Sequence, residues 1–407
     1  MNANTTRTPG VRKISVAARA SKSPKALLLA AAGVSLAVPA LGSAFDFNAF
    51  GEPSAEETAM FDKLWGNFVL YKNEKNPLLE EFKLIGKYQG QYYWVDSDEG
   101  NADGWEDRRF RFGFDAKMFE KTIEVRATFQ STDNFDPFYN GLEDAYIKWK
   151  PNKNFTLTAG HMKPLIGYFD WLQSSDLQQT FDSSQVFNQL LVNRILGLTA
   201  EGKVGEFSWQ VGGYSNDSDK EFGKFGGAYS FGAGVGYDAK ACFGWEKADF
   251  RLDWIHSGHD KDDHLFTRYD DIVSATFWGE QGPWALVVEG FNGSGGERRD
   301  GDVFGFFIQP MYDLIPKRLQ LVGRYSFTDG DGPDSVIRQT RYESEAPELT
   351  GGGRGDRYQA FYLGAQYFIY GDKLKLMAGA EYAKLDGGGN GGDYEGVTFL
   401  TGVRFYF

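Results

Sequence analysis

The sequence is poor in the features that stabilise small secreted domains and helical membrane proteins. It contains one cysteine, Cys242, in 407 residues, so an internal disulfide is excluded. No uninterrupted apolar run of 18 residues follows residue 45, which excludes membrane-spanning helices in that part of the chain. Any membrane insertion must therefore use β-strands. Cys242 falls in a segment that we predict to be a strand, so we expect a free, buried thiol there.

Patterns typical of catalysis and of metal binding are also missing. The sequence has only 4 histidines, and none of them stands in a recognisable pairing with a serine nucleophile. We therefore expect a protein that is not an enzyme and that uses no cofactor and no metal.

The charge is strongly negative, and its distribution separates the first 44 residues from the rest. The chain has 43 Lys and Arg against 56 Asp and Glu. Residues 1–44 contain basic side chains and no acidic one, then the apolar run Ala26 to Val38, then Gly42-Ser43-Ala44. This pattern predicts a signal peptide cleaved after Ala44. The remaining chain is more acidic still, which argues against nucleic acid as a partner.

The rest of the chain is rich in aromatic residues and glycine, and it alternates in the way that lipid-facing strands do. There are 35 Phe, 21 Tyr and 51 Gly. In Val397 to Phe407, apolar residues occupy every second position, and sixteen segments with this alternation or with many aromatics can be counted. We predict strands at 83–95, 106–119, 121–131, 142–150, 154–162, 194–202, 206–214, 232–243, 247–257, 269–279, 283–292, 302–312, 317–328, 357–370, 373–384 and 395–407.

Short and long connections alternate between these segments. Tight turns such as Gly371-Asp372 alternate along the chain with long loops such as residues 329–356. An even number of antiparallel strands with this alternation is typical of a transmembrane β-barrel with short periplasmic turns and long extracellular loops. We therefore predict an all-β fold, a barrel of about 16 strands over residues 83–407, in the outer membrane.

Two segments do not fit the strand pattern. Residues 45–82 are expected to form either a periplasmic lead-in or a plug-like segment, in which Ser54-Ala55-Glu56-Glu57 could cap a short helix. The third loop, residues 163–193, is too apolar to extend into solvent, so we expect it to fold inward and narrow the lumen; Ser174-Ser175-Asp176 could open a short helix in it. Packing against a neighbouring subunit is the alternative for this loop. The acidic stretch Asp96 to Asp107 is expected to be an exposed loop.

Alternation also assigns residues to the lumen. A charged side chain that faces lipid at the membrane midplane destabilises the barrel by a few kcal/mol, about 2–4 for Arg or Lys. Charged residues in the strands are therefore expected to face inward. The basic pore-lining candidates are Arg109, Arg111, Arg126, Lys148, Lys240, Arg251, Arg324, Lys375 and Arg404. Basic side chains on a pore wall favour anions. The alternative is that they only form ion pairs with lumen acids such as Asp115 and Glu124.

Three of the predicted strands share a sequence pattern with a known family. The first contains Arg108-Arg109-Phe110-Arg111-Phe112-Gly113-Phe114, the second contains Leu142-Glu143-Asp144-Ala145-Tyr146-Ile147-Lys148-Trp149-Lys150-Pro151, and the third leads into the third loop with Thr158-Ala159-Gly160-His161-Met162-Lys163-Pro164. Together these segments resemble the phosphate-selective porin O and P family. The resemblance implies a sixteen-stranded, homotrimeric porin whose third loop narrows the channel. After Pro164 the chain departs from the family pattern, so no phosphate-binding residue is carried over.

The sequence therefore predicts an outer-membrane porin that allows passive diffusion of small hydrophilic solutes, with a preference for anions. Its expected partners are these solutes, including phosphate, the outer-membrane lipid, and further copies of the chain in a homotrimer. The alternatives are a phosphate or polyphosphate channel, and a structural or adhesive barrel that does not conduct.

Overall fold

The computed structural model describes residues 51–131, 135, 137–215, 218, 221–222, 229–258, 266–295, 301–332, 334–339, 342–343, 353–387 and 393–407. The expected signal peptide, residues 1–44, lies outside the described residues, as does the first part of the segment 45–82.

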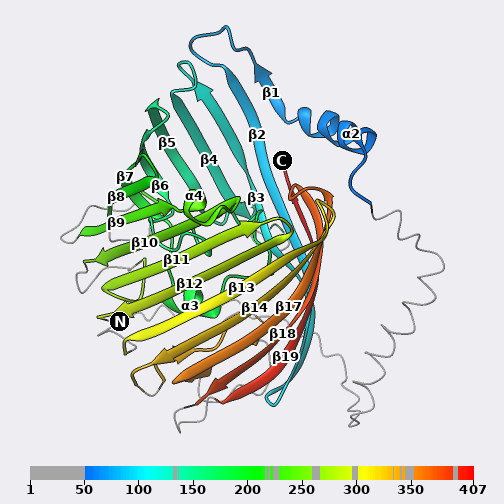
Figure 1. Cartoon of the computed structure of the whole chain (residues 1–407), viewed down its shortest axis with the longest axis vertical. Helices are drawn as coiled ribbons and strands as arrows, with labels where there is room; N and C mark the ends of the chain where they lie inside the picture. Colours follow the sequence, from blue (N-terminus) through cyan, green and yellow to red (C-terminus); the bar gives the residue numbers. More distant parts are fainter. Residues whose placement is uncertain are drawn as a thin grey trace, which may run out of the picture. The chain divides into compact units, whose positions relative to one another are not determined.

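Sixteen long strands of the described residues form a closed antiparallel barrel (Figure 1). Each strand pairs with its neighbours in the chain, and β19 closes the barrel against β2, from Gly396 opposite Ser97 to Tyr406 opposite Lys87. The strands are β2 (Glu81–Ser97), β3 (Gly100–Met118), β4 (Ile123–Ser131), β5 (Leu142–Asn152), β6 (Phe155–Met162), β7 (Ile195–Val204), β8 (Phe207–Ser215), β9 (Tyr229–Asp238), β10 (Lys247–Ser257), β11 (Asp271–Gln281), β12 (Trp284–Ser294), β13 (Val303–Ile315), β14 (Leu319–Gly330), β17 (Arg357–Tyr370), β18 (Leu374–Asp386) and β19 (Tyr394–Tyr406). The predicted barrel fold and its strand number are confirmed.

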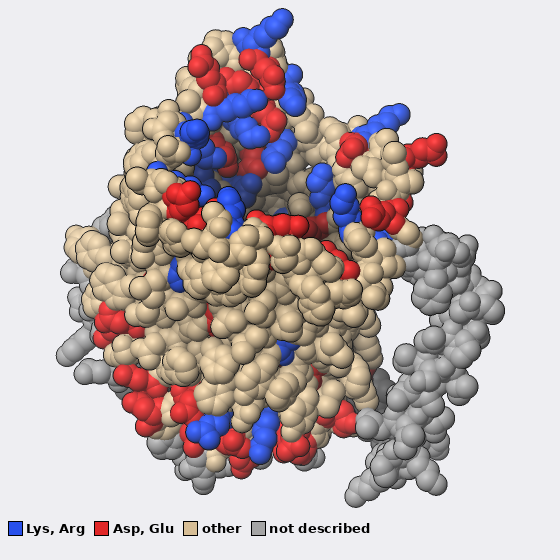
Figure 2. All heavy atoms as spheres, viewed as in Figure 1, with Lys and Arg blue, Asp and Glu red and all other residues tan. Residues whose placement is uncertain are grey.

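The outer face of the barrel is apolar and exposed. Leu363 on β17 is 71% exposed and Phe361 is 55% exposed, although both belong to regular strands. Figure 2 shows a broad band with few charges over the barrel wall, and most Lys, Arg, Asp and Glu gather towards its two ends. Such a band is the surface that hydrocarbon requires of a membrane-spanning barrel.

The first expected loop is in fact a strand hairpin. β2 and β3 continue to a tight turn between Ser97 and Gly100, and they include most of the acidic stretch from Asp96 to Asp107. Tyrosine hydroxyls of β2 donate to carboxylates of β3, Tyr88 to Asp107 at 2.6 Å and Tyr92 to Asp103 at 2.8 Å. These cross-strand bonds satisfy acids that the sequence pattern alone assigns to solvent, so the loop prediction is wrong.

The predicted strand 232–243 is also too long. β9 ends at Asp238, and the short helix α4 (Lys240–Phe243) makes the turn to β10, ending at Gly244 with φ 69°. Lys240 pairs with Asp238 at 2.8 Å in this turn, so its assignment to a lumen-facing strand is wrong. Cys242 is exposed, so the expected burial of its thiol is wrong too.

The exposed thiol gives a direct test of the turn. Purified, folded protein should react with one equivalent of a charged maleimide at Cys242, because α4 leaves the side chain open to solvent. If α4 lies on the periplasmic side, intact cells should show no labelling until the outer membrane is permeabilised. Labelling of intact cells would mean that the turn faces the outside and that the topology is the reverse of the expected one. A Cys242→Ser variant serves as the blank.

The segment before the barrel contains a helix and a short strand. α2 (Ala55–Gly66) begins after Ser54, whose hydroxyl accepts from the backbone N–H of Glu57 at 3.1 Å, as the capping pattern predicted. β1 (Val69–Lys72), which the sequence analysis missed, pairs with β2. None of the helices in the described ranges has the length and apolar composition needed to cross a membrane.

The third loop, residues 163–193, lies in the lumen. It bonds to inward side chains of strands from all around the barrel, including Lys87 on β2, Glu289 on β12 and Arg324 on β14. Its helix α3 (Gln185–Leu190) begins after Ser184, so the helix expected at Ser174 is displaced.

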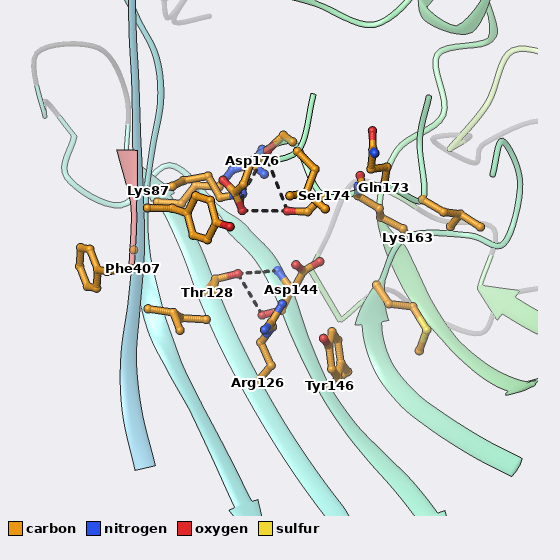
Figure 3. Close-up of a pocket in the computed structure, with 18 of the residues that line it drawn as sticks. Lys87, Arg126, Thr128, Asp144, Tyr146, Lys163, Gln173, Ser174, Asp176 and Phe407 are labelled. Carbon is orange, nitrogen blue, oxygen red and sulfur yellow. Dashed lines mark hydrogen bonds and ion pairs between the residues drawn. The ribbon is translucent and has the colours of Figure 1, made fainter. Parts of the chain in front are cut away.

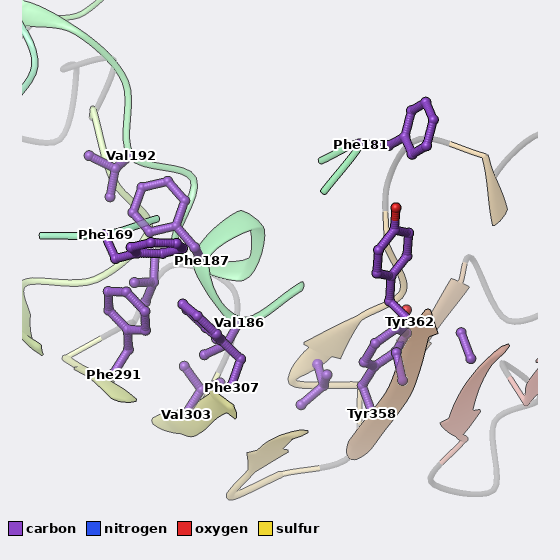
Figure 4. Packing of buried hydrophobic residues seen from close by; sticks show 14 of the residues in the cluster. Phe169, Phe181, Val186, Phe187, Val192, Phe291, Val303, Phe307, Tyr358 and Tyr362 are labelled. Atoms are coloured by element: carbon purple, nitrogen blue, oxygen red, sulfur yellow. The ribbon is translucent and has the colours of Figure 1, made fainter. Parts of the chain in front are cut away.

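The loop is held by an apolar cluster on one side of the lumen. Val186 and Phe187 of α3 lie beside Phe291, Val303 and Phe307 of β12 and β13 (Figure 4). The segment between β14 and β17 also reaches this region, where β15 (Val336–Ile337) pairs with β16 (Arg354–Gly355) and side chains of α3 donate to the carbonyls of Ser335 and Ile337. The apolar cluster therefore fills this side of the barrel and leaves the opposite side, lined by β2 to β7, for a cavity.

Candidate functional site: the lumen cavity

A cavity of about 1050 Å³ lies between the inner wall and the third loop (Figure 3). Its walls come from α2, from β1 to β8, from β10, β11, β17 and β19, and from the loop. Because inward residues alternate with lipid-facing ones, strands such as β5 contribute every second residue, Asp144, Tyr146 and Lys148, whereas β2 contributes the consecutive residues Lys83 to Lys87. Among the described residues, the basic side chains that line it are Lys83, Lys87, Arg111, Arg126, Lys148, Lys163, Arg194, Arg251 and Lys373. The acidic ones are Asp62, Asp144, Asp176 and Glu201.

Four of the predicted pore-lining residues belong to this cavity, namely Arg111, Arg126, Lys148 and Arg251. Three of them are paired: Arg126 with Asp115 at 2.6 Å, Arg111 with Glu143 at 2.7 Å and Arg251 with Asp253 at 2.8 Å. Lys148 has no ion pair within the described residues; its ammonium lies 4.8 Å from the centre of the Tyr146 ring. Pairing is therefore extensive, and it leaves part of the positive charge uncompensated.

Four other predicted residues lie on the inner wall but not on the cavity. Arg324 donates to the carbonyl of Asp182 at 2.9 Å, Lys375 to that of Gln178 at 3.0 Å and Arg404 to that of Phe181 at 3.4 Å. These three hold the backbone of the third loop. Arg109 donates to Gln89 at 2.7 Å. Arg324, Lys375 and Arg404 therefore position the loop, whereas Arg109 bonds within the barrel wall. Lys240, in the turn helix α4, belongs to neither group.

Arg108 is an inward residue that strict alternation misses. The pairing of β2 with β3 shifts by one residue between Gln89 and Gly90, so that Arg108 is the extra residue of a bulge. Its guanidinium reaches Asp182 of the third loop at 3.1 Å, while Arg109 also faces inward. The sequence contains a sign of this bulge, because strict alternation would point the charged side chain of Arg108 at the lipid.

Lys87, Lys163 and Arg194 are cavity residues that the sequence analysis did not select. Lys87 pairs with Asp176 at 2.9 Å, and Arg194 pairs with Asp144 at 2.8 Å. Lys163 donates to the carbonyls of Trp171 and Gln173. Lys163 is the first residue of the third loop, where no strand pattern exists to assign a direction, and Arg194 is the first residue of the strand predicted at 194–202, where the alternation begins.

Burial and neighbouring charges shift the pKa values of side chains in the third loop in opposite directions. Burial favours the neutral form of Asp176, yet Lys87 holds the pKa of this carboxyl below its usual value, so Asp176 is ionised at neutral pH. Burial lowers the pKa of Lys163 well below its ordinary value.

Comparison with known proteins supports the barrel fold and the family resemblance noted in the sequence. A model of the family "Phosphate-selective porin O and P" matches residues 82–239. No curated protein sequence matches the chain.

Solved outer-membrane channels share the architecture at low sequence identity. OmpF of Salmonella typhi has a TM-score of 0.57 at 13% identity, over 80% of this chain and 98% of its own. OprB of Pseudomonas putida has a TM-score of 0.55 at 12% identity, over 80% and 94%. The outer membrane channel DcaP of Acinetobacter baumannii has a TM-score of 0.52 at 13% identity, over 83% and 100%. At such identities the likeness concerns the fold.

The family match begins at β2 and ends after β9, and it includes the three motifs at residues 108–114, 142–151 and 158–164 that carried the resemblance. Residues 82–239 thus match the phosphate-selective porin O and P family, within a barrel that has the architecture of outer-membrane porins.

Proposed function

We propose that the protein is an outer-membrane porin for passive diffusion of small hydrophilic solutes, with a preference for anions. The observation that carries the proposal is the composition of the cavity wall, where nine basic side chains face four acidic ones. Permeating ions respond to charges within about a Debye length, roughly 8 Å at physiological salt. The acidic character of the whole chain therefore matters less to a solute in the lumen than the basic wall does.

Ion pairing with lumen acids reduces this preference without abolishing it. Asp115 receives both Lys83 and Arg126, so one carboxylate is shared by two cations. Glu143 receives both Arg111 and Arg194, but Arg194 also pairs with Asp144, so the charges of that group balance. The excess positive charge on this wall therefore comes from the sharing at Asp115 and from Lys148, which has no ion pair within the described residues. The resemblance to the family further implies a homotrimer, and export to the outer membrane fits the apolar outer band.

The test is the reversal potential of single channels in a potassium chloride gradient. The wild-type protein should favour chloride modestly. Replacing Arg111, Arg126 and Lys148 together by Gln should shift selectivity towards potassium, more at low salt than at high salt. Arg357→Gln, at an exposed pair with Asp329 on the outer face, is the control and should change nothing. Cation preference in the wild type, or no shift in the triple variant, would contradict the proposal.

The same recording separates the alternatives. A structural or adhesive barrel would give no conductance in planar bilayers. A phosphate channel, which the family match favours, would show chloride current that falls steeply when millimolar phosphate is added. A general anion-preferring porin would show only the small change expected from the added ionic strength.

A further inference from the structure

The cavity wall contains aromatic rings with cations placed over them. Tyr146 and Tyr168 both line the cavity, with Lys148 4.8 Å from the centre of the first ring and Arg251 5.1 Å from the centre of the second. Trp278 and Tyr370 line it too, with Lys247 and Lys373 over their rings. Four separate cation–ring pairs thus recur around one cavity.

These rings remain accessible to a solute. All four are half-buried, whereas the phenylalanines that pack around α3, such as Phe169 and Phe187, are almost fully buried. In Figure 3 Tyr146 lies near Arg126 of the neighbouring strand, among the residues that line the cavity. The rings of the cavity are therefore part of the surface that a permeating molecule meets.

A cation over a ring differs from a cation paired with a carboxylate. The ring attracts the ammonium through its quadrupole and carries no net charge, so the positive charge stays available to a second, anionic partner. Lys148 and Lys373 have no carboxylate partner within the described residues. At these places a solute can contact a free cation and an exposed ring at once.

Small inorganic anions gain only the charge interaction at such a place. A planar organic anion gains a second one, because its ring can stack on the tyrosine while its carboxylate approaches the cation. Tyr146 is the best placed of the four rings, because Lys148 lies over it at 4.8 Å and Arg126 lies 6.0 Å from its centre.

We propose that Tyr146, Lys148 and Arg126 form a subsite that binds small aromatic carboxylates as they pass through the lumen. The inference rests on the proposed porin function and names a solute class for it. The ring of the solute stacks against Tyr146 and its carboxylate approaches Lys148, while Arg126, whose guanidinium is paired with Asp115, acts at longer range. The other cation–ring pairs offer weaker sites of the same kind along the cavity.

The test compares benzoate with acetate, which carry the same charge and differ in the ring. Each is added to single channels that carry chloride current, and its half-blocking concentration is measured. Benzoate should block at lower concentration than acetate. Tyr146→Leu should raise the half-blocking concentration of benzoate by about twofold to tenfold, the range that a lost aromatic pair implies, and leave that of acetate unchanged.

Two variants guard against trivial effects. Tyr146→Phe keeps the ring and should keep benzoate block near the wild-type value. Tyr229→Leu makes the same change at an exposed tyrosine outside the cavity and should have no effect. An unchanged reversal potential in Tyr146→Leu shows that the barrel and its charges are intact.

The outcomes distinguish this inference from the proposed function. Anion-preferring channels in which benzoate blocks no better than acetate would overturn the inference and leave the porin function standing. Equal weakening of benzoate and acetate by Tyr146→Leu would also overturn it, because the ring would then act only through the cations. Cation-preferring or silent wild-type channels would remove the proposed function itself.

Discussion

Replacing Glu289 by leucine should release the third loop and give channels with frequent, large current fluctuations. Glu289 on β12 is fully buried and accepts from the backbone N–H groups of Phe169 at 3.0 Å and Asp170 at 2.9 Å. Asp170 in turn accepts from the backbone N–H of Ser184 at 2.8 Å, at the start of α3. This chain of bonds joins the barrel wall to the loop helix.

Leucine would leave two buried backbone donors without partners, at a cost of about 1–3 kcal/mol for each. The strand ladder of β12 with β11 and β13 uses only backbone groups, so the barrel itself should remain folded. The loss should therefore fall on the loop. It would be seen as current noise and as faster cleavage of residues 163–193 by a protease in detergent.

Two further variants make the result specific. Glu289→Gln retains one acceptor oxygen and should give an intermediate phenotype. Glu280→Leu removes a half-exposed carboxylate near the end of β11 and should be silent. Quiet channels with a protease-resistant loop in Glu289→Leu would show that the apolar cluster around α3 holds the loop without this carboxylate.

The strands could be predicted from the sequence because their cause is local. A lipid-facing strand must alternate whatever surrounds it, so Val397 to Phe407 shows its outward face without reference to the rest of the chain. The capping serine of α2 is equally local, since Ser54 and Glu57 are three residues apart. Features of this kind were found with boundaries close to the observed ones.

The site depends on contacts that no local pattern carries. Glu289 meets Phe169 across 120 residues of sequence, and Arg324 meets Asp182 across 142. Alternation correctly places Arg324 inward, but it cannot say that the side chain is used to hold a loop. A single bulge at Arg108 likewise changes which charges face the lumen. The sequence therefore predicts which residues line the inner wall of the barrel. The three-dimensional structure is needed to separate those that face the cavity from those that hold the third loop.

The helix before the barrel forms part of the cavity mouth. Trp65 of α2 lines the cavity, is 7% exposed and donates from its indole N–H to the carbonyl of Tyr406 at 2.7 Å. Its ring packs against Tyr370 and Phe405 at centroid distances of 4.9 and 5.4 Å. The helix is thus docked on the ends of β17 and β19, at the seam where β19 meets β2.

Docking of α2 should also weaken in acid. The two terminal nitrogens of Arg318 donate to the two carboxylate oxygens of Glu57 at 3.0 and 2.7 Å. This hydrogen bonding lowers the pKa of Glu57. A carboxyl whose pKa is lowered by docking stabilises the docked state above its ordinary pKa of 4.5, and this contribution is lost as the pH falls below that value. Cleavage of α2 by a protease active in acid should therefore become faster below about pH 4, and less so in an Arg318→Gln variant, which has lost the contact already.

Trp65→Ala should undock α2 and widen the mouth of the cavity. Truncating a buried tryptophan costs about 3–5 kcal/mol, and Trp65 is the buried residue of this twelve-residue helix. We expect rapid tryptic cleavage at Lys63 and a higher single-channel conductance, with the barrel still heat-modifiable. Met60→Ala on the same helix is the control, because Met60 is 60% exposed and its loss should leave both readouts unchanged. Trp65→Ala channels with wild-type conductance and a protected Lys63 would mean that β1 and the stacked rings of Phe68 and Phe407, 3.7 Å apart, hold the segment in place without the indole.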